Sequence, residues 1–143
     1  MRILVVEDLG ADALLFREAL RDAGLAQSLS FATDGAEALD KLRNEPAPDL
    51  LLLDLDLPRV SGREVLDGVR RDPRLRMLPV VIITTSPSPD DIHFAYEHHA
   101  NAYMRKPNGY LALSGVAEAI RDFWIRTAIL PQPVHPQARL ANG

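Results

Sequence analysis

The chain has 143 residues, of which 47% are hydrophobic and 25% charged, so it is long enough for one domain with a proper core and too short for a comfortable two. Its formal charge is −4 and it has no basic run, which argues against nucleic acid as a direct partner. It has no cysteine, and no apolar run nears the length of a signal-peptide core or a membrane span. We therefore expect a soluble, cytoplasmic protein without disulfides, thiolate metal sites or membrane association.

Short apolar runs alternate with segments of helical spacing along the chain. We predict strands at residues 3–6, 29–32, 50–53, 80–83 and 102–104. We predict helices at about residues 11–23, 35–43, 61–71, 89–99 and 110–128. Because a crossover between parallel strands is right-handed and carries a helix, this alternation predicts an α/β fold, a doubly wound five-stranded parallel sheet with helices on both faces.

The C-terminal residues differ in composition from the rest of the chain. From Pro131 the sequence reads PQPVHPQARLANG, and Pro131, Pro133 and Pro136 exclude a regular helix. We therefore predict one domain over residues 1–128, followed by a proline-rich arm over residues 129–143 that can contribute to a contact between two chains.

The third predicted strand leads to a candidate functional residue. Leu50 to Leu53 form an apolar run too short for a good helix, which indicates a strand buried on both faces. Asp54 then lies at the carboxyl end of that strand. Pro58 and Gly62 mark a turn at the edge where open α/β sheets bind ligands. By itself, Asp54 is explained equally well as a turn residue.

Other polar residues follow the remaining predicted strands. They are Glu7 and Asp8 after the first strand, Thr84 at the end of the fourth, and Lys106 after the fifth. In a parallel sheet these strand ends share one edge, so the side chains converge there with Asp54. Crowded carboxylates require a cation, and Mg²⁺ suits them because it accepts carboxylate, water and phosphate oxygens. Singly, each has an ordinary explanation, such as a helix-dipole contact for Glu7 and Asp8 or a surface position for Lys106.

In chain order, these features resemble the receiver domains of two-component response regulators of the chemotaxis type. The resemblance covers about residues 1–125. It rests on the acidic pair at residues 7 and 8, the run DLDLPRVSG, a Thr ending the fourth strand, Tyr103, and Lys106 before Pro107. It implies the flavodoxin-like strand order 2-1-3-4-5. It also implies signalling rather than ordinary enzyme turnover, because Asp54 would accept a phosphoryl group from a histidine kinase and lose it slowly.

The resemblance also implies a Mg²⁺ site. The side chains of Asp8 and Asp54 would bind the ion directly, and Glu7 would bind it through a water. Asp56 would contribute its backbone carbonyl. Glu7 stands where aspartate is often found, and the Asp56 side chain would lie beside the phosphoryl group.

Roles for Lys106, Thr84 and Tyr103 follow from the same resemblance. Lys106 would neutralise charge on the phosphoryl oxygens, and a cis bond to Pro107 would aim its ammonium into the site. After phosphorylation, Thr84 would turn its hydroxyl to the phosphate and Tyr103 would follow inward. This switch would change the surface formed by the fourth helix, the fifth strand and the fifth helix.

Two other functions fit parts of the pattern. DLDLP after an apolar strand also resembles haloacid-dehalogenase-type phosphatases, in which Asp54 would be the nucleophile and Asp56 the general acid. Such enzymes have Thr or Val where this chain has Pro58, and their acidic pair follows the motif instead of preceding it. The third alternative is a binding module that works without phosphorylation, and it is disfavoured because no expected site residue is missing.

The end of the last predicted helix suggests self-association. The stretch AIRDFWIRTAIL directs apolar groups over more than one helix face, which indicates a partner surface or, alternatively, a frayed part of the core. The expected homodimer contacts are Ile120, Phe123, Trp124, Ile125, Ile129 and Leu130.

A narrower resemblance concerns the partner. The stretches FW…TAILP and TTSPSPDDI are similar to those of stand-alone receivers that pair with phytochrome-type histidine kinases and tend to form dimers. Because the chain ends soon after the last helix, we expect no DNA-binding or catalytic output domain. The signal would then leave through protein contacts.

Overall fold

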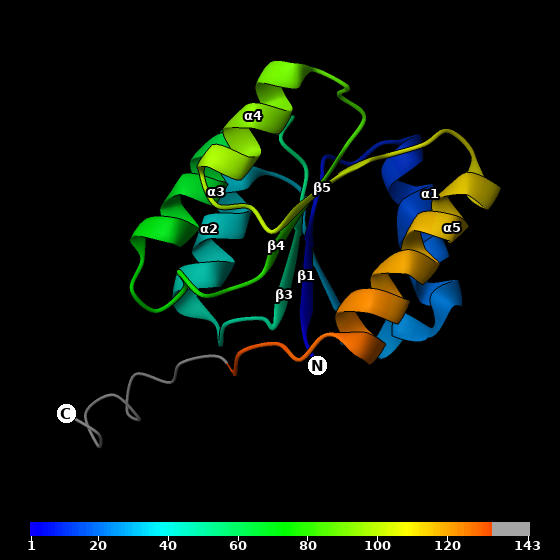
Figure 1. The fold of residues 1–143 in the computed structure, drawn as a ribbon, viewed down its shortest axis with the longest axis horizontal. Coiled ribbons are helices and arrows are strands. Elements are labelled where there is room, and N and C mark those ends of the chain that lie inside the picture. The colour runs from blue at the N-terminus through cyan, green and yellow to red at the C-terminus, as the bar shows by residue number, and fades with distance from the viewer. Residues whose placement is uncertain (133–143) are drawn as a thin grey trace.

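The computed structural model describes residues 1–132, and these residues contain one parallel sheet (Figure 1). Its strands lie in the order β2-β1-β3-β4-β5, as the resemblance implied. Their bounds are β1 Ile3–Val6, β2 Leu29–Ala32, β3 Leu50–Leu53, β4 Val80–Thr84 and β5 Ala102–Arg105. The predicted strands are confirmed. Both β4 and β5 extend one residue further than their apolar runs, because Thr84 and Arg105 still pair with each other.

Within the described residues, helices cover both faces of the sheet, with α2, α3 and α4 on one side and α1 and α5 on the other (Figure 1). Their bounds are α1 Ala11–Leu20, α2 Gly35–Asn44, α3 Gly62–Arg71, α4 Pro89–Glu97 and α5 Tyr110–Ile120. The doubly wound architecture is therefore confirmed. Over residues 1–132, no helix combines the length and the apolar character needed to cross a membrane.

Two of the predicted helices change geometry before they end. The first is regular only to Leu20 and continues as a wider turn over Arg21–Leu25, in which Gly24 has a left-handed φ of 93°. The last is regular to Ile120 and continues as a wider turn over Arg121–Thr127. Apolar residues recur through both turns, so the sequence pattern does not distinguish them from regular helix.

The leucine run of β3 is buried on both faces, as predicted. Leu51 and Leu53 pack in a core with α2 and α3, whereas Leu50 and Leu52 pack in a second core with α1 and α5. None of the four exceeds 1% exposure. Successive side chains of a strand point to opposite faces, so a central strand between two helical layers must be apolar throughout.

The strand register brings the candidate site residues to one edge. Because β1 and β3 run in parallel register, Glu7 and Asp54 follow their last residues side by side. The Asp54 amide donates to the Val6 carbonyl at 2.9 Å, which continues the ladder to the site. On the neighbouring pair of strands, the Lys106 amide donates to the Thr84 carbonyl at 2.7 Å.

Gly62 lets α3 begin directly against the backbone that carries Asp54. An added Cβ at Gly62 would lie 2.1 Å from the Asp54 carbonyl oxygen and 2.5 Å from the Leu55 Cα. The Gly62 amide donates to the Leu55 carbonyl at 3.0 Å, and Ser61 caps the helix by accepting from the Glu64 amide at 3.3 Å. The loop after Asp54 is therefore held against the first turn of α3.

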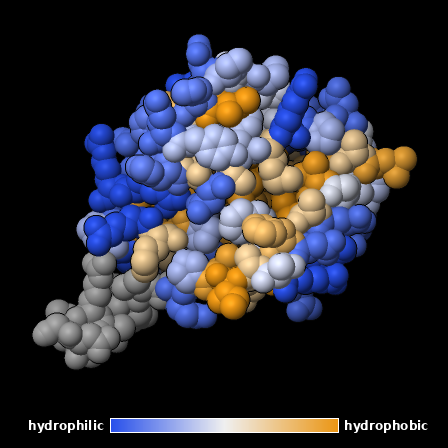
Figure 2. Space-filling view, viewed as in Figure 1, coloured by the Kyte–Doolittle hydropathy of each residue, from blue (hydrophilic) through white to orange (hydrophobic). Residues whose placement is uncertain are grey.

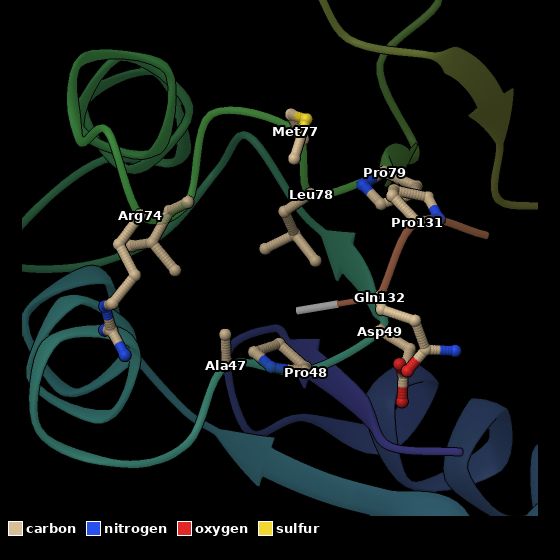
Figure 3. A pocket seen from close by; sticks show the side chains of 10 residues that line it. Ala47, Pro48, Asp49, Arg74, Met77, Leu78, Pro79, Pro131 and Gln132 are labelled. Atoms are coloured by element: carbon tan, nitrogen blue, oxygen red, sulfur yellow. The ribbon is translucent and has the colours of Figure 1, made fainter. Parts of the chain in front are cut away.

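The described part of the C-terminal arm lies along the amino edge of the sheet. Leu130 packs against the core formed with α1 and α5. Pro131 and Gln132 line a small pocket with Pro79 and Leu78, which lie just before β4 (Figure 3). These arm residues thus contact their own domain. The rest of the predicted arm, including Pro133 and Pro136, lies outside the described residues.

The prediction that Ile120 belongs to the homodimer surface is wrong. Ile120 is fully buried, because it follows Leu113 and Ala117 on the α5 face that packs against the sheet. In contrast, Phe123 is 53% exposed and Ile129 is 98% exposed. Trp124, Ile125 and Leu130 are partly buried against the same core. Figure 2 shows apolar surface on the α1 and α5 side of the molecule.

Gly62→Ala is expected to destabilise the fold by roughly 3 kcal/mol, because the added methyl group overlaps backbone atoms at the end of β3. Urea unfolding followed by Trp124 fluorescence measures the change. Gly115→Ala is the matched control. Gly115 lies within α5 with open space where the methyl group would go, so we expect stabilisation by about 0.5 to 1 kcal/mol. Similar effects of both substitutions would contradict the packing argument.

Candidate functional site

Glu7, Asp54, Thr84 and Lys106 lie together at the carboxyl edge of the sheet, where their positions after the strands predicted them. The Lys106 ammonium lies 2.7 Å from Glu7 Oε2 and 3.7 Å from Asp54 Oδ2. The side chains of Lys106 and Glu7 are almost fully buried, whereas that of Asp54 is 15% exposed. One ammonium therefore serves two carboxylates, of which one is enclosed and the other is open to an incoming group.

Lys106 enters the site from the end of β5. Its ammonium also lies 5.8 Å from the centre of the Phe16 ring on α1. The bond from Lys106 to Pro107 is trans, as are the other peptide bonds of the described residues. The cis bond implied by the resemblance is therefore wrong for this structure. The trans form is the lower-energy one for such bonds, and with it the ammonium reaches both carboxylates.

Asp54 lies in surroundings that disfavour its ionised form. Burial raises the pKa of the Asp54 carboxyl. The Asp56 amide, the Lys106 ammonium and the Thr84 hydroxyl oppose this rise by binding the carboxylate. The Asp56 amide donates to Asp54 Oδ1 at 3.0 Å. Groups from three separate segments thus stabilise the ionised carboxylate without fully offsetting its loss of water.

Glu7 is enclosed more completely than Asp54. Burial raises the pKa of the Glu7 carboxyl, its contact with Lys106 opposes the rise, and the nearby Asp54 adds to it. Glu7 Oε1 is buried and has no hydrogen-bond partner among the described residues. An unpaired buried oxygen is costly, and two carboxylates share one ammonium here. The site is therefore short of positive charge.

This shortage fits the divalent cation that the resemblance implies. Asp8 follows Glu7 directly and is exposed, as is Asp56. In the part of the chain that the structure describes, no three acidic or histidine side chains are grouped closely enough to hold a metal by themselves. Mg²⁺ needs no such group, because it keeps several waters and binds through one or two carboxylates. The oxygen donors at this edge therefore suit a hard dication.

Thr84 and Tyr103 both contact the segment between β4 and α4. Thr84 is fully buried, and its hydroxyl accepts a weak hydrogen bond of 3.4 Å from the Ser86 amide. Tyr103 is partly buried, and its phenol donates to the Ser86 carbonyl at 2.8 Å. Burial raises the pKa of the Tyr103 hydroxyl. The two residues expected to form the switch therefore meet at Ser86.

Three residues of this region, Ser86, Asp91 and Arg63, were assigned no role from the sequence, although Ser86 and Asp91 lie in the stretch TTSPSPDDI. Ser86 Oγ donates to Asp91 Oδ2 at 2.5 Å, and Arg63 pairs with the other carboxylate oxygen of Asp91. Asp91 lies in the first turn of α4 and Arg63 in the first turn of α3, so no local spacing rule brings them together. The available signals were the place of Ser86, two residues after Thr84, and the stretch TTSPSPDDI, which contains Ser86 and Asp91.

Residues 3–117 of the chain match the response regulator receiver domain family. The chain is 40% identical over 136 residues to the probable methanogenesis regulatory protein FilR2 of Methanothrix harundinacea, covering 92% of this chain and 88% of FilR2. It is 39% identical over 135 residues to response regulator Rcp1 of Synechocystis sp., covering 90% of this chain and 92% of Rcp1.

Solved structures of two such proteins have similar folds. The Mn²⁺-bound form of Rcp1 matches with a TM-score of 0.83 and 39% identity, over 91% of this chain and 98% of that one. The phosphorylated cyanobacterial phytochrome response regulator RcpA matches with a TM-score of 0.85 and 40% identity, over 92% of this chain and 98% of that one.

Asp54→Asn is expected to stabilise the metal-free protein at pH 7, raising Tm by about 2 to 5 °C, because it removes a carboxyl whose ionisation the fold disfavours. A raised folded pKa means that the folded state holds more protons than the unfolded state. Wild-type stability therefore falls as pH rises through the ordinary carboxyl pKa toward the folded value. The gain should accordingly vanish below about pH 4.

Thermal unfolding in a chelator, repeated across this pH range, measures the effect. Asp56→Asn is the matched control, because Asp56 is exposed in the same loop and should change Tm little. A gain for Asp54→Asn that persists unchanged in acid would contradict the electrostatic explanation.

Proposed function

The chain belongs to the response regulator receiver domain family and acts in phosphorylation-based signalling, and we propose that Asp54 is the residue that accepts the phosphoryl group. The observation that carries the proposal is that Asp54 lies at the carboxyl edge, within reach of a buried ammonium and still open to solvent. An Asp54 oxygen would attack phosphorus. The phosphorus–nitrogen bond of a kinase phosphohistidine would break, and its electron pair would leave with the imidazole.

Lys106 and Glu7 would prepare the site for this transfer. The Lys106 ammonium lies 3.7 Å from Asp54 Oδ2, so it is near the oxygens that a transferred phosphoryl group would bring. Charge on those oxygens is the main obstacle to such transfer, and a fixed cation lowers it. Glu7 would keep the ammonium in place through its 2.7 Å contact.

We infer Mg²⁺ as the cofactor. The side chains of Asp8 and Asp54 and the backbone carbonyl of Asp56 would hold it, and Glu7 would act through a water. The unpaired Glu7 Oε1 supports this assignment, and the Mn²⁺-bound form of Rcp1 supports a divalent ion in this family. When bound, the ion supplies further positive charge beside the phosphoryl oxygens.

We propose a histidine kinase of the phytochrome type as the phosphoryl donor. The support is the likeness to RcpA, which is described as a cyanobacterial phytochrome response regulator. Direct transfer requires the kinase and this chain to share a compartment, which we take to be the cytoplasm.

We also propose a homodimer through the face built from α4, β5 and α5. Phe123 and Ile129 offer the largest free apolar surfaces among the expected contacts. Trp124 packs edge-on against Phe123 with ring centres 5.0 Å apart, so the two rings form one continuous apolar group. Homodimer contacts of this kind are isologous, so one self-complementary patch is enough. Thr84 and Tyr103 would report phosphorylation to the same face.

The hydrolase alternative has less support. A phosphatase of the haloacid-dehalogenase type would need the Asp56 carboxyl as general acid, but the contact of Asp56 with Asp54 runs through its backbone amide. The family match also favours a receiver. A binding module that works without phosphorylation is distinguished by the first experiment below.

Incubation with acetyl phosphate and Mg²⁺ is expected to add one phosphoryl group to the wild-type chain, detected by intact mass. Asp54→Asn should gain none, because the amide oxygen is a poor nucleophile. Asp56→Asn keeps the backbone amide and should still be modified, whereas a phosphatase would lose its general acid. An unmodified wild type would favour the binding module, and equal modification of Asp54→Asn would exclude Asp54 as the acceptor.

The proposed metal role of Asp8 has its own test. Asp8→Asn should weaken Mg²⁺ binding roughly tenfold or more, because one direct carboxylate ligand is lost. Calorimetric titration measures the affinity. Asp12→Asn, an exposed acid in the first turn of α1, should leave it unchanged. Unchanged affinity in Asp8→Asn would remove Asp8 from the metal site.

Phe123→Glu is expected to convert the dimer to a monomer, because it places a charge in the proposed apolar contact. Light scattering at tens of micromolar measures the mass. Leu14→Glu is the matched control, since Leu14 has a similar exposure of 57% but lies on α1, outside the proposed face. A wild-type chain that is monomeric at this concentration would contradict the homodimer.

A further inference from the structure

Ser86 lies where polar contacts from the site and from α4 meet. Its amide donates to the Thr84 hydroxyl at 3.4 Å, and its carbonyl accepts from the Tyr103 phenol at 2.8 Å. Its own hydroxyl donates to Asp91 Oδ2 at 2.5 Å and accepts from the Ser88 amide at 3.2 Å. Thr84 and Tyr103 thus both bind the Ser86 backbone. The Ser86 side chain in turn binds Asp91 of α4.

Asp91 is itself held from a third element. Arg63, in the first turn of α3, pairs with Asp91 Oδ1, while Ser86 occupies Oδ2. The Arg63 guanidinium also lies 4.4 Å from the centre of the Phe94 ring on α4. Bonds to an ionised carboxylate are about twice as strong as neutral ones. The bonds from Ser86 and Arg63 lower the pKa of the Asp91 carboxyl, so it stays ionised near neutral pH.

The segment between β4 and α4 depends on such side-chain bonds. Pro87 and Pro89 have no amide hydrogen, so they cannot donate to neighbouring backbone. Ser88 precedes α4 but its side chain makes no cap bond. The contact from Ser86 to Asp91 is therefore a principal restraint on this segment.

We propose that Asp91 is a positioning residue for the switch, which with Arg63 fixes Ser86 and thereby holds Tyr103 and Thr84 toward the phosphoacceptor site. This role of Asp91 rests on the proposed function, because its effect on signalling requires that Asp54 be phosphorylated.

The consequence follows from the geometry of the Ser86 backbone. When Ser86 is fixed, its carbonyl offers the Tyr103 phenol one constant acceptor, and its amide keeps the Thr84 hydroxyl beside Asp54. When Ser86 is released, the Tyr103 ring is free to spend more time in solvent. The inward position of Tyr103 is the one that the phosphorylated state favours, so a smaller inward population in the free protein makes phosphorylation less favourable and slower.

A double-mutant cycle distinguishes positioning from a general structural role. Asp91→Ala should slow phosphorylation by acetyl phosphate about fivefold to tenfold, the factor that corresponds to the typical net free energy of one hydrogen bond. In a Tyr103→Phe background, which lacks the phenol, the same substitution should have clearly less effect. A merely structural contribution would slow both backgrounds equally.

Asp90→Ala is the matched control. Asp90 is the neighbouring exposed acid in the same turn of α4, so its loss changes charge and helix dipole equally but leaves Ser86 tied. It should leave the phosphorylation rate unchanged. Asp91→Asn retains an acceptor for Ser86 and should restore part of the lost rate.

Fluorotyrosine NMR of the metal-free protein, with no phosphoryl donor present, observes Tyr103 directly. The Tyr103 resonance, assigned by its loss in Tyr103→Phe, should move toward the position of exposed tyrosine in Asp91→Ala and not in Asp90→Ala. An unmoved resonance, or additive effects in the cycle, would overturn the positioning role. This readout needs no phosphorylation, so it judges the proposal even if Asp54 proves not to be the acceptor.

Discussion

The contact between the Lys106 ammonium and Glu7 determines how the rest of the carboxyl edge behaves. The ammonium lies a full 1.0 Å closer to Glu7, at 2.7 Å, than to Asp54, at 3.7 Å. Glu7 therefore holds the Lys106 ammonium, and Asp54 interacts with it more weakly. Breaking such a buried pair by removing one partner typically costs about 3 to 5 kcal/mol, because the other charge is left without compensation. Glu7 is thus important for stability as well as for the proposed metal site.

The strand ends were predictable because two simple constraints act together. A strand covered by helices on both faces must be apolar throughout, so Leu50 to Leu53 revealed β3. Parallel strands then deliver whatever follows them to one edge, so Asp54 and Lys106 had to meet whatever the details of packing. The predictions that used only these constraints agree with the described structure.

The Ile120 prediction was wrong because of helix orientation, and the bridge at Ser86 was missed because it depends on long-range contacts. Ile120 and Phe123 are both strongly apolar in sequence. Ile120 lies on the face of α5 that packs against the sheet, whereas Phe123 lies in the wider turn after α5 and is exposed. The bridge from Ser86 through Asp91 to Arg63 joins side chains from three segments, and its two ends are far apart along the chain. Hydrophobic periodicity contains no information about such polar contacts, because it reports burial and not partner choice.

The two edges of the sheet differ in how completely their buried polar groups are hydrogen-bonded. At the amino edge, the Arg70 guanidinium donates to the carbonyls of His99 and Leu78 and to the Asn101 side chain, among others. The donors of Arg70 are therefore well used, and this edge joins α3 to the loops before β4 and β5. At the carboxyl edge, Glu7 Oε1 has no partner among the described residues and two carboxylates share one ammonium. A ligand that supplies positive charge there should add its binding free energy to the stability of the fold. The Arg70 donors at the amino edge are thus satisfied, whereas the carboxyl edge keeps an unpartnered carboxylate oxygen that a cation can bind.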